Sequence, residues 1–391
     1  MDARGGNGKS ETTEPSPPAA AGPGPLKRPL FIGSEIYRQS SYGPRHPLAI
    51  PRVSSTIDLC RALGWLPDEA YLDSPLAEPG QLARFHDEDY IAAVIAAEAA
   101  QEASPEVQRR YNLGRIDNPI FPEMFRRPAT ASGAALLAAR LLAEGGVVYS
   151  PAGGTHHGRP GRASGFCYFN DPVLAILGLL DQGVAPIYYV DVDAHHGDGV
   201  QDAFADDERV MTLSIHEHGR WPFSGALDDR AGGMARNLPV PRGFNDSELR
   251  FLVDTVVVPL GERLRPAAVV LQCGADGLED DPMSKLSLSN RALWYAVAQV
   301  AGLAPRCLTL GGGGYNPWSV ARCWAGVWAV LNHVPVPERL PGQAEAVLRA
   351  LSWHRQAGRN PPAHWTTTLA DLPRNGPIRD EIRHIAAASL L

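Results

Sequence analysis

The sequence predicts an α/β protein with a central, mostly parallel sheet covered by helices on both faces. Short β-branched runs alternate with longer segments rich in Ala and Leu, which is typical of parallel strands joined by crossover helices. The apolar runs are nearly continuous, as in Ala267–Leu271 (AAVVL), which is typical of strands buried on both faces. Each run also passes directly into polar or glycine-rich residues.

The elements follow from these patterns in chain order. The expected strands are Gly146–Ser150, Pro186–Asp193, Val210–Ile215, Ala267–Cys273 and Cys307–Leu310. The expected helices are Asp87–Ala103, Ala129–Glu144, Pro172–Gln182, Ser247–Arg265, Ser289–Leu303 and Pro317–Val334. Pro259 and the run Val256–Val258 weaken the helix expected at 247–265, since proline breaks the hydrogen-bond ladder and β-branched residues are poor helix formers.

The organisation of the chain is simple. Residues 1–28 are rich in Gly, Pro, Ser, Thr and Ala, which predicts a disordered N-terminal tail. No long linker or internal repeat follows, so we expect residues 29–391 to form a single domain. With 391 residues and 44% apolar residues, the chain can bury a large core.

Composition excludes several classes of function. The formal net charge of −7 disfavours a nucleic-acid binder, because phosphate-driven binding needs a basic surface. No apolar run approaches the roughly 18–20 residues of a membrane span. The five cysteines form no C-x-x-C pair, which argues against a disulfide scaffold or a thiolate zinc site. With no apolar segment of a secretory signal in residues 1–28, a cytoplasmic location is expected.

Three residues at the end of the second expected strand have the spacing of metal ligands. Asp191, Asp193 and His195 are spaced i, i+2, i+4, which places them on one face of an extended strand. Carboxylates and imidazoles bind zinc and other divalent first-row metals, and Asp276 is the best-placed further ligand. Three protein ligands would leave an open position for water, as in catalytic sites. Alternatively, the two aspartates only cap the next turn and His195 is a solvated loop residue.

His156 and His157 follow a Gly-Gly-Thr turn. Neighbouring side chains of an extended segment point in opposite directions, so we expect the pair to have two roles. One would act as general base or acid, and the other would be its electrostatic partner. Asp191 and Asp198 are the candidate carboxylates that fix their tautomers. Alternatively, one of the two histidines is a packed core residue.

The run Gly311–Gly314 has neither the lysine of a P-loop nor the G-x-G-x-x-G spacing of a dinucleotide site. Four glycines allow close approach of the backbone to another group. Tyr315 follows directly, and its phenol could donate a hydrogen bond to a carbonyl oxygen that gains charge in a transition state. Alternatively, this tyrosine caps a surface turn.

Five motifs together resemble the zinc-dependent histone deacetylase superfamily, which includes bacterial acetoin-utilization proteins and acetylpolyamine amidohydrolases. They are Gly-Thr-His-His (154–157), Ala-Ser-Gly-Phe-Cys-Tyr-Phe-Asn-Asp (163–171), Asp-Val-Asp-Ala-His-His-Gly-Asp-Gly-Val (191–200), Leu-Gln-Cys-Gly-Ala-Asp (271–276) and Leu-Gly-Gly-Gly-Gly-Tyr-Asn (310–316). The resemblance covers roughly residues 30–335 and implies an arginase-like three-layer α/β fold.

The resemblance also implies roles for individual residues. It assigns one Zn²⁺ to Asp193, His195 and Asp276. It makes His157 the general base and acid, with His156 as the supporting histidine and Asp191 and Asp198 as their carboxylate partners. Tyr315 would polarise the substrate carbonyl. A structural K⁺ would be held by Asp191, Asp193, His195, Ser214 and the Ile215 carbonyl, with Phe204 and Val210 serving a second monovalent site.

The same resemblance places an apolar acyl channel around the reactive groups. Its implied substrate-binding residues are Phe166 and Phe223 as walls, Met283 and Asp117 at the rim, Gly165 and Gly313 beside the reactive groups, and Arg52 on an internal acetate exit. An apolar rim residue suits an acyl-lysine stem, whereas polyamine-selective relatives place an acidic group there.

The expected function is therefore zinc-dependent hydrolysis of the amide of acetyl-lysine in a peptide or protein. Two alternatives stay open: an acetylpolyamine or other small acyl-amide hydrolase, and a weakly active scaffold that binds acylated ligands. An acidic surface would suit cationic, lysine-rich substrates. The acyl chain length and the oligomeric state are left open.

Overall fold

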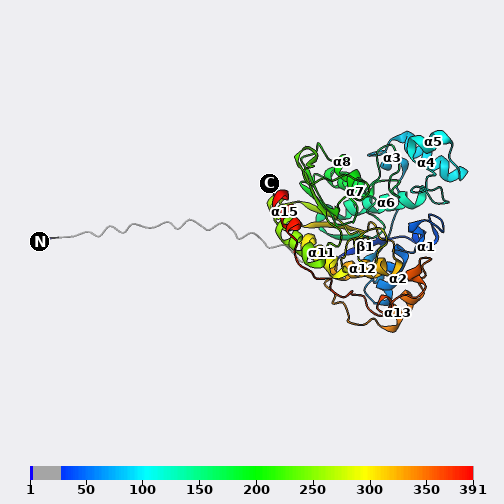
Figure 1. The fold of residues 1–391 in the computed structure, drawn as a ribbon. Coiled ribbons are helices and arrows are strands. Elements are labelled where there is room, and N and C mark those ends of the chain that lie inside the picture. Colours follow the sequence, from blue (N-terminus) through cyan, green and yellow to red (C-terminus); the bar gives the residue numbers. More distant parts are fainter. Residues whose placement is uncertain (3–27, 391) are drawn as a thin grey trace.

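The computed structural model describes residues 1–2 and 28–390, so the tail expected at 1–28 lies almost wholly outside the described residues. One parallel eight-stranded sheet forms the centre, in the order β2-β1-β3-β8-β7-β4-β5-β6 (Figure 1). In chain order its strands are β1 (Leu30–Gly33), β2 (Tyr71–Asp73), β3 (Gly146–Ser150), β4 (Ile187–Asp191), β5 (Val210–Glu217), β6 (Ala235–Val240), β7 (Ala268–Gln272) and β8 (Arg306–Leu310).

Helices cover both faces of this sheet. They are α1 (Ile36–Gln39), α2 (Val53–Ala62), α3 (Pro79–Leu82), α4 (Glu88–Ala100), α5 (Pro105–Tyr111), α6 (Arg126–Leu141), α7 (Asp171–Leu180), α8 (Asp198–Ala203), α9 (Asp246–Leu252), α10 (Val258–Leu264), α11 (Asn290–Ala301), α12 (Pro317–Leu331), α13 (Gly342–Arg349), α14 (His364–Thr367) and α15 (Asp380–Ser389). Helices α6 and α7 pack on one face, and α2, α11 and α12 pack on the other (Figure 1). The expected three-layer α/β architecture is confirmed.

The two layers of core differ in composition. Large aromatic side chains fill the face under α12, where Trp318, Trp324 and Trp328 are buried. The layer under α6 and α7 contains smaller residues, including the alanines of α6. These alanines allow α6 and α7 to approach each other closely. No helix among residues 28–390 combines the length and the apolar character needed to cross a lipid bilayer.

The five expected strands are all present, and the three strands that pattern reasoning missed are short or polar. β2 and β6 are the edge strands, which need no continuous apolar run because one side of each is unpaired. β6 even contains Pro239, a residue tolerated at sheet edges. β1 has only four residues, too few to show a period.

The helix expected over 247–265 is not α-helical throughout. It consists of α9, a π-helical turn η5 (Val253–Val257) and α10. Pro259 lies in the first turn of α10, where a missing N–H breaks no helical hydrogen bond. The proline is therefore accommodated within one continuous helical segment, directly after a widened turn.

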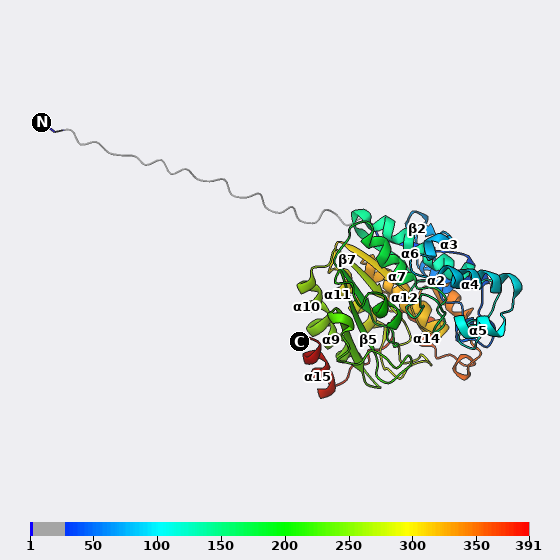
Figure 2. The same cartoon turned by 90° about the horizontal axis from the view of Figure 1, so that it is seen from above.

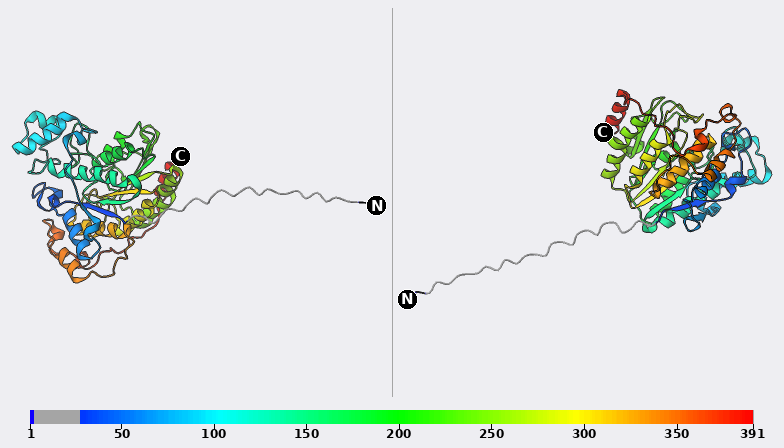
Figure 3. Two further views of the ribbon diagram at one scale, coloured as in Figure 1. Left: turned by 180° about the vertical axis from the view of Figure 1, so that it is seen from behind. Right: turned by 90° about the horizontal axis from the view of Figure 1, so that it is seen from below.

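Two helices from the C-terminal part of the described chain complete the helical layers. Helix α13 lies against α2 (Figure 3), and α15 packs on α9 and β6 (Figure 2). The loops at the carboxyl ends of β3, β4, β5, β7 and β8 meet at one edge of the sheet, where ligands bind in open α/β folds.

Candidate active site

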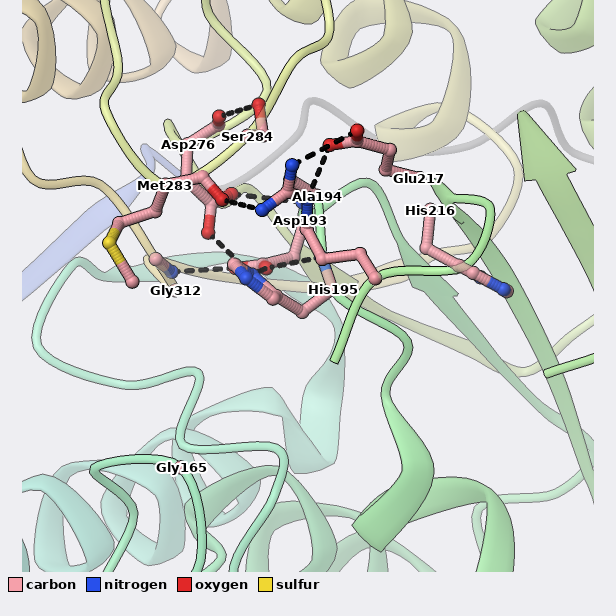
Figure 4. Close-up of polar contacts among 12 residues, drawn as sticks. Gly165, Asp193, Ala194, His195, His216, Glu217, Asp276, Met283, Ser284 and Gly312 are labelled. Atoms are coloured by element: carbon pink, nitrogen blue, oxygen red, sulfur yellow. Dashed lines mark hydrogen bonds and ion pairs between the residues drawn. The ribbon is translucent and has the colours of Figure 1, made fainter. Parts of the chain in front are cut away.

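Asp193, His195 and Asp276 meet at this edge of the sheet, as the sequence predicts. One ligand atom of each lies within 4.8 Å of the other two. The Nδ1 atom of His195 is 3.1 Å from Asp193 Oδ1 and 2.9 Å from Asp276 Oδ2. All three side chains are buried and point toward one another (Figure 4).

The reason that Asp193 and His195 share a face is not strand pleating. β4 ends at Asp191, and both residues lie in the loop beyond it. The carboxylate of Asp191 accepts the Asp193 N–H at 3.0 Å, and the carboxylate of Asp193 accepts the His195 N–H at 2.9 Å. These are successive Asx turns. The aspartates therefore do cap the turn, and the same capping presents Asp193 and His195 to Asp276.

Glycines allow this close approach. A Cβ atom on Gly313 would lie 2.0 Å from Asp276 Oδ2, and one on Gly274 would lie 2.1 Å from Asp193 Oδ2. The Gly313 N–H donates to Asp193 Oδ2 at 2.6 Å. Gly313, which the sequence predicts to contact the substrate, therefore also stabilises the positions of the candidate metal ligands Asp193 and Asp276. The close approach expected of the glycine run is confirmed.

The electrostatics of the cluster fit a cation. Burial opposes a charge on His195, but the carboxylates of Asp276 and Asp193 outweigh it and raise the pKa of His195 to about 10. Despite burial, neighbouring imidazoles hold the pKa of Asp193 far below its usual range. Two buried carboxylates and one imidazole are a donor set that suits Zn²⁺. The residues present therefore fit the metal that the sequence motifs imply.

His156 and His157 lie side by side, with ring centroids 3.9 Å apart, so the expectation that they point in opposite directions is wrong. Both lie in a turn after β3 and not in an extended segment. Each still has its own carboxylate partner. His156 Nδ1 is 2.7 Å from Asp191 Oδ2, and His157 Nδ1 is 2.6 Å from Asp198 Oδ1.

The two imidazoles have opposite protonation tendencies. Burial disfavours charge on His156, but the carboxylates of Asp191 and Asp193 reverse this and raise its pKa to about 9. Burial and the neighbouring His156 lower the pKa of His157 to about 3. A single proton on the pair therefore resides on His156, which leaves His157 neutral.

Asp198 is also held by a cation. Although burial opposes it, the hydrogen bond from His157 is the first of several interactions that lower the pKa of Asp198 to about 2. The guanidinium of Arg159 contacts the second oxygen of this carboxylate. Asp198 therefore stays ionised and orients the His157 ring.

An open cavity of about 810 Å³ leads from the surface to these groups. Its lining includes Asp117, His157, Gly165, Phe166, His195, Met283 and Tyr315. Every expected substrate-binding residue except Gly313 and Arg52 lines it. Phe166 and Tyr315 meet edge to face, with ring centroids 5.9 Å apart. The Asp117 carboxylate accepts hydrogen bonds from the amides of Asn112 and Asn118.

Phe223 lines this cavity, but only at its outer end. Its side chain is 76% exposed, so it cannot enclose a substrate stem as an inner wall. That position belongs to Trp221, whose ring lies 4.6 Å from the His157 ring and 6.4 Å from the His195 ring. A Cβ on Gly165 would lie 2.3 Å from the Trp221 ring, which explains glycine there. The segment Trp221-Pro222-Phe223 holds two aromatic residues, and only the tertiary structure selects between them.

A second, much smaller cavity of about 50 Å³, the inner cavity, adjoins the first, outer cavity and shares His157, Phe166 and Tyr315 with it. Gly313 and Arg52 line it, together with Arg127, which sequence reasoning missed. Arg52 is partly buried, with its guanidinium donating to the Gly312 carbonyl at 2.6 Å. Its Nε atom has no partner among the described residues.

Tyr315 stands where the two cavities meet. Its backbone N–H donates to Asp281 at 2.6 Å, which anchors the residue. Burial and the nearby Asp276 carboxylate raise the pKa of the Tyr315 phenol far above its usual range. The phenol therefore stays protonated and can donate a hydrogen bond.

The residues expected to hold potassium lie in two places. Asp191 and Ser214 are neighbours in the register of β4 and β5, and Ile215 follows on β5. Phe204 and Val210 flank a turn in which the Asp207 N–H donates to the Phe204 carbonyl at 3.1 Å. The Ser214 Oγ lies 3.0 Å from His216 Nδ1.

Comparison with known proteins supports the same reading. A family model described as the histone deacetylase domain matches residues 46–331. The chain is 36% identical over 333 residues to histone deacetylase 19 of Arabidopsis thaliana, covering 82% of this chain and 66% of that protein. It is 35% identical over 309 residues to histone deacetylase 1 of Homo sapiens, covering 77% of this chain and 64% of that protein. The chain thus spans about two thirds or less of the length of these relatives.

Solved structures match over nearly the whole chain. The crystal structure of an HDAC homolog from Aquifex aeolicus has a TM-score of 0.88 and 34% sequence identity, covering 93% of this chain and 100% of that chain. The structure of an HDAC homolog complexed with SAHA matches equally well. With this fold, this site and these relatives, the chain belongs to the histone deacetylase family.

Proposed function

We propose that residues 29–391 form one catalytic domain that hydrolyses the amide of acetyl-lysine in a peptide or protein. One observation carries the proposal. A carboxylate-paired imidazole, His157, faces the Asp193, His195 and Asp276 cluster at the inner end of an open cavity, with the Tyr315 hydroxyl beside it. A base, a metal-ligand set and a hydrogen-bond donor converging on one point form a site for amide hydrolysis.

Asp193, His195 and Asp276 would hold one Zn²⁺. When bound, zinc supplies a Lewis acid and lowers the pKa of a water molecule toward about 7. Asp191, Asp193, His195, Ser214 and the Ile215 carbonyl would hold a structural K⁺, with the Phe204 and Val210 carbonyls serving a second one.

His157 would take a proton from the attacking water, because it is the neutral member of the histidine pair. Asp198 orients its ring through Nδ1, which leaves Nε2 free to accept that proton. His156 would be the positively charged member of the pair, and its ring centroid lies 3.9 Å from that of His157. Tyr315 donates to the carbonyl oxygen as negative charge grows on it. His157 then returns the proton to the leaving lysine amine.

The outer cavity would receive the lysine side chain between Phe166 and Trp221. Met283 adds an apolar contact at the rim, and Asp117 would accept hydrogen bonds from the substrate backbone. The inner cavity would receive the acetate product, because Arg52 and Arg127 supply positive charge there.

Acetylpolyamine hydrolysis is the main competing activity, and binding of acylated ligands without turnover is the other. A rate comparison separates them. The zinc-loaded protein is assayed with an acetyl-lysine peptide, acetylputrescine and acetylspermidine. A higher kcat/KM for the peptide supports the proposal. A higher value for either polyamine would replace it, and binding of all three without turnover would favour the scaffold.

A further inference from the structure

The outer cavity is lined by charged residues of both signs. Asp117 lies on the loop after α5. Three basic residues also line the cavity, Arg220, Arg242 and Lys285, which we call the basic rim. They come from three loops: the one after β5, the one after β6 and the one that contains Met283. The protein as a whole has a net charge of −7, so the charge of the basic rim is opposite in sign to the net charge of the protein.

Glu217 fixes the geometry of the basic rim and neutralises one of its charges. Its carboxylate is 4% exposed and accepts two hydrogen bonds from the Arg220 guanidinium. It also accepts the Lys285 N–H at 2.8 Å. Arg220 in turn donates to the Met283 carbonyl at 2.6 Å. The buried carboxylate therefore ties the loop after β5 to the loop around Met283.

Arg242 and Lys285 differ from Arg220. Both side chains are exposed, and neither forms an ion pair with a carboxylate of residues 28–390. The ion pairs of this region use Arg220, Arg374 and Arg379 instead. The two loops are joined through the backbone, since the Gly243 N–H donates to the Lys285 carbonyl at 2.7 Å. Two uncompensated positive charges are therefore held on adjoining loops beside the entrance.

We propose that the basic rim selects acyl-lysine peptides that carry an acidic residue beside the modified lysine. This inference rests on the proposed function and names its substrate class. At physiological salt the Debye length is about 8 Å. A substrate at the mouth therefore interacts electrostatically more strongly with Arg242 and Lys285 than with distant acidic residues. The rim also disfavours polyamines, whose remaining amines are cationic.

The experiment compares three acetyl-lysine peptides of equal length, with Glu, Ala or Lys on both sides of the acetylated residue. Each exposed charge pair changes binding by about 1.4- to 5-fold. Each of the two rim charges attracts the Glu peptide and repels the Lys peptide. We therefore expect kcat/KM for the Glu peptide to exceed that for the Lys peptide by about 4-fold or more. The ratio should approach 1 in about 1 M salt, where the Debye length is about 3 Å.

Charge reversal tests the residues themselves. The double variant Arg242→Glu, Lys285→Glu should invert the order of the Glu and Lys peptides. The double variant Arg140→Glu, Arg263→Glu is the matched control, because it makes the same change of charge on two exposed residues of α6 and α10, at the opposite edge of the sheet. The control should keep the wild-type ratio.

The outcomes separate this inference from the proposed function. Turnover of all three peptides within twofold of one another would overturn the rim's role and leave the deacetylase activity standing. The same applies if the double variant keeps the wild-type order. No turnover of any peptide by the zinc-loaded protein would overturn the proposed function, and the inference with it.

Discussion

Replacing Tyr315 by Phe removes one hydroxyl from the place where the two cavities meet. The rest of the residue should stay in position. Its backbone N–H is anchored by Asp281, and Phe166 packs against the ring. The side chain is only 7% exposed, so phenylalanine fills the same space.

The size of the effect follows from the state of that hydroxyl. Its raised pKa keeps it protonated at neutral pH, so wild type offers one donor to the carbonyl oxygen. Loss of one such donor costs about 2.7–4 kcal/mol of transition-state stabilisation, or about 10²–10³ in kcat. The donor acts mainly on the transition state, so KM should change little.

The assay is kcat and KM on an acetyl-lysine peptide, together with zinc content by elemental analysis. Tyr188→Phe is the matched control. Its hydroxyl is also buried but donates to the Val257 carbonyl at 3.1 Å, in the core away from the cavities. That variant should lose about 1 kcal/mol of stability and keep its rate. A Tyr315→Phe enzyme with full zinc content and kcat within threefold of wild type would refute the assigned role.

Three further predictions concern the metal site and acid stability. Asp193→Ala should leave the purified protein with little zinc by elemental analysis, and full occupancy would contradict the ligand set. Gly313→Ala should weaken zinc affinity by about tenfold or more in a chelator competition, because its Cβ would lie 2.0 Å from Asp276 Oδ2. Gly80→Ala, which meets no atom within 4 Å, should bind zinc as wild type does. Burial lowers the pKa of His86 to about 4, whereas in the unfolded chain it is about 6.5. The unfolded chain therefore binds the proton first, and about 3 kcal/mol of stability is lost as pH falls from about 6.5 to 4. Urea unfolding across this interval should show a weaker pH dependence in His86→Gln, and an unchanged slope would contradict the assignment.

Much of the fold could be predicted because parallel strands that are buried on both faces have continuous apolar runs in the sequence. An apolar run such as Ala268–Leu271 is continuous because both faces of β7 are covered. β6 has no such continuous apolar run. It lies at the sheet edge, pairs on one side only and includes Arg236 and Pro239. The π-helical turn before Pro259 was also not predictable, because it is an adjustment of one helix to its packing.

The chemistry of the candidate site was readable from residue types. Asp193, His195 and Asp276 are metal-binding residue types at strand ends, and parallel strands bring their carboxyl ends to one edge. The directions in which the side chains point could not be predicted from the sequence. His156 and His157 lie side by side because their loop turns, and periodicity describes only regular backbone.

The sequence by itself determined the parallel sheet, the residues able to bind a metal and move a proton, and the edge at which they gather. Those features depend on local apolar patterns and on the chemistry of each side chain. Only the tertiary structure decided that Trp221 and not Phe223 faces the histidines, and that Glu217 joins Arg220 to the backbone of Lys285. The physical reason is that these contacts form between irregular loops from different strands. Their geometry depends on long-range packing that no local pattern encodes.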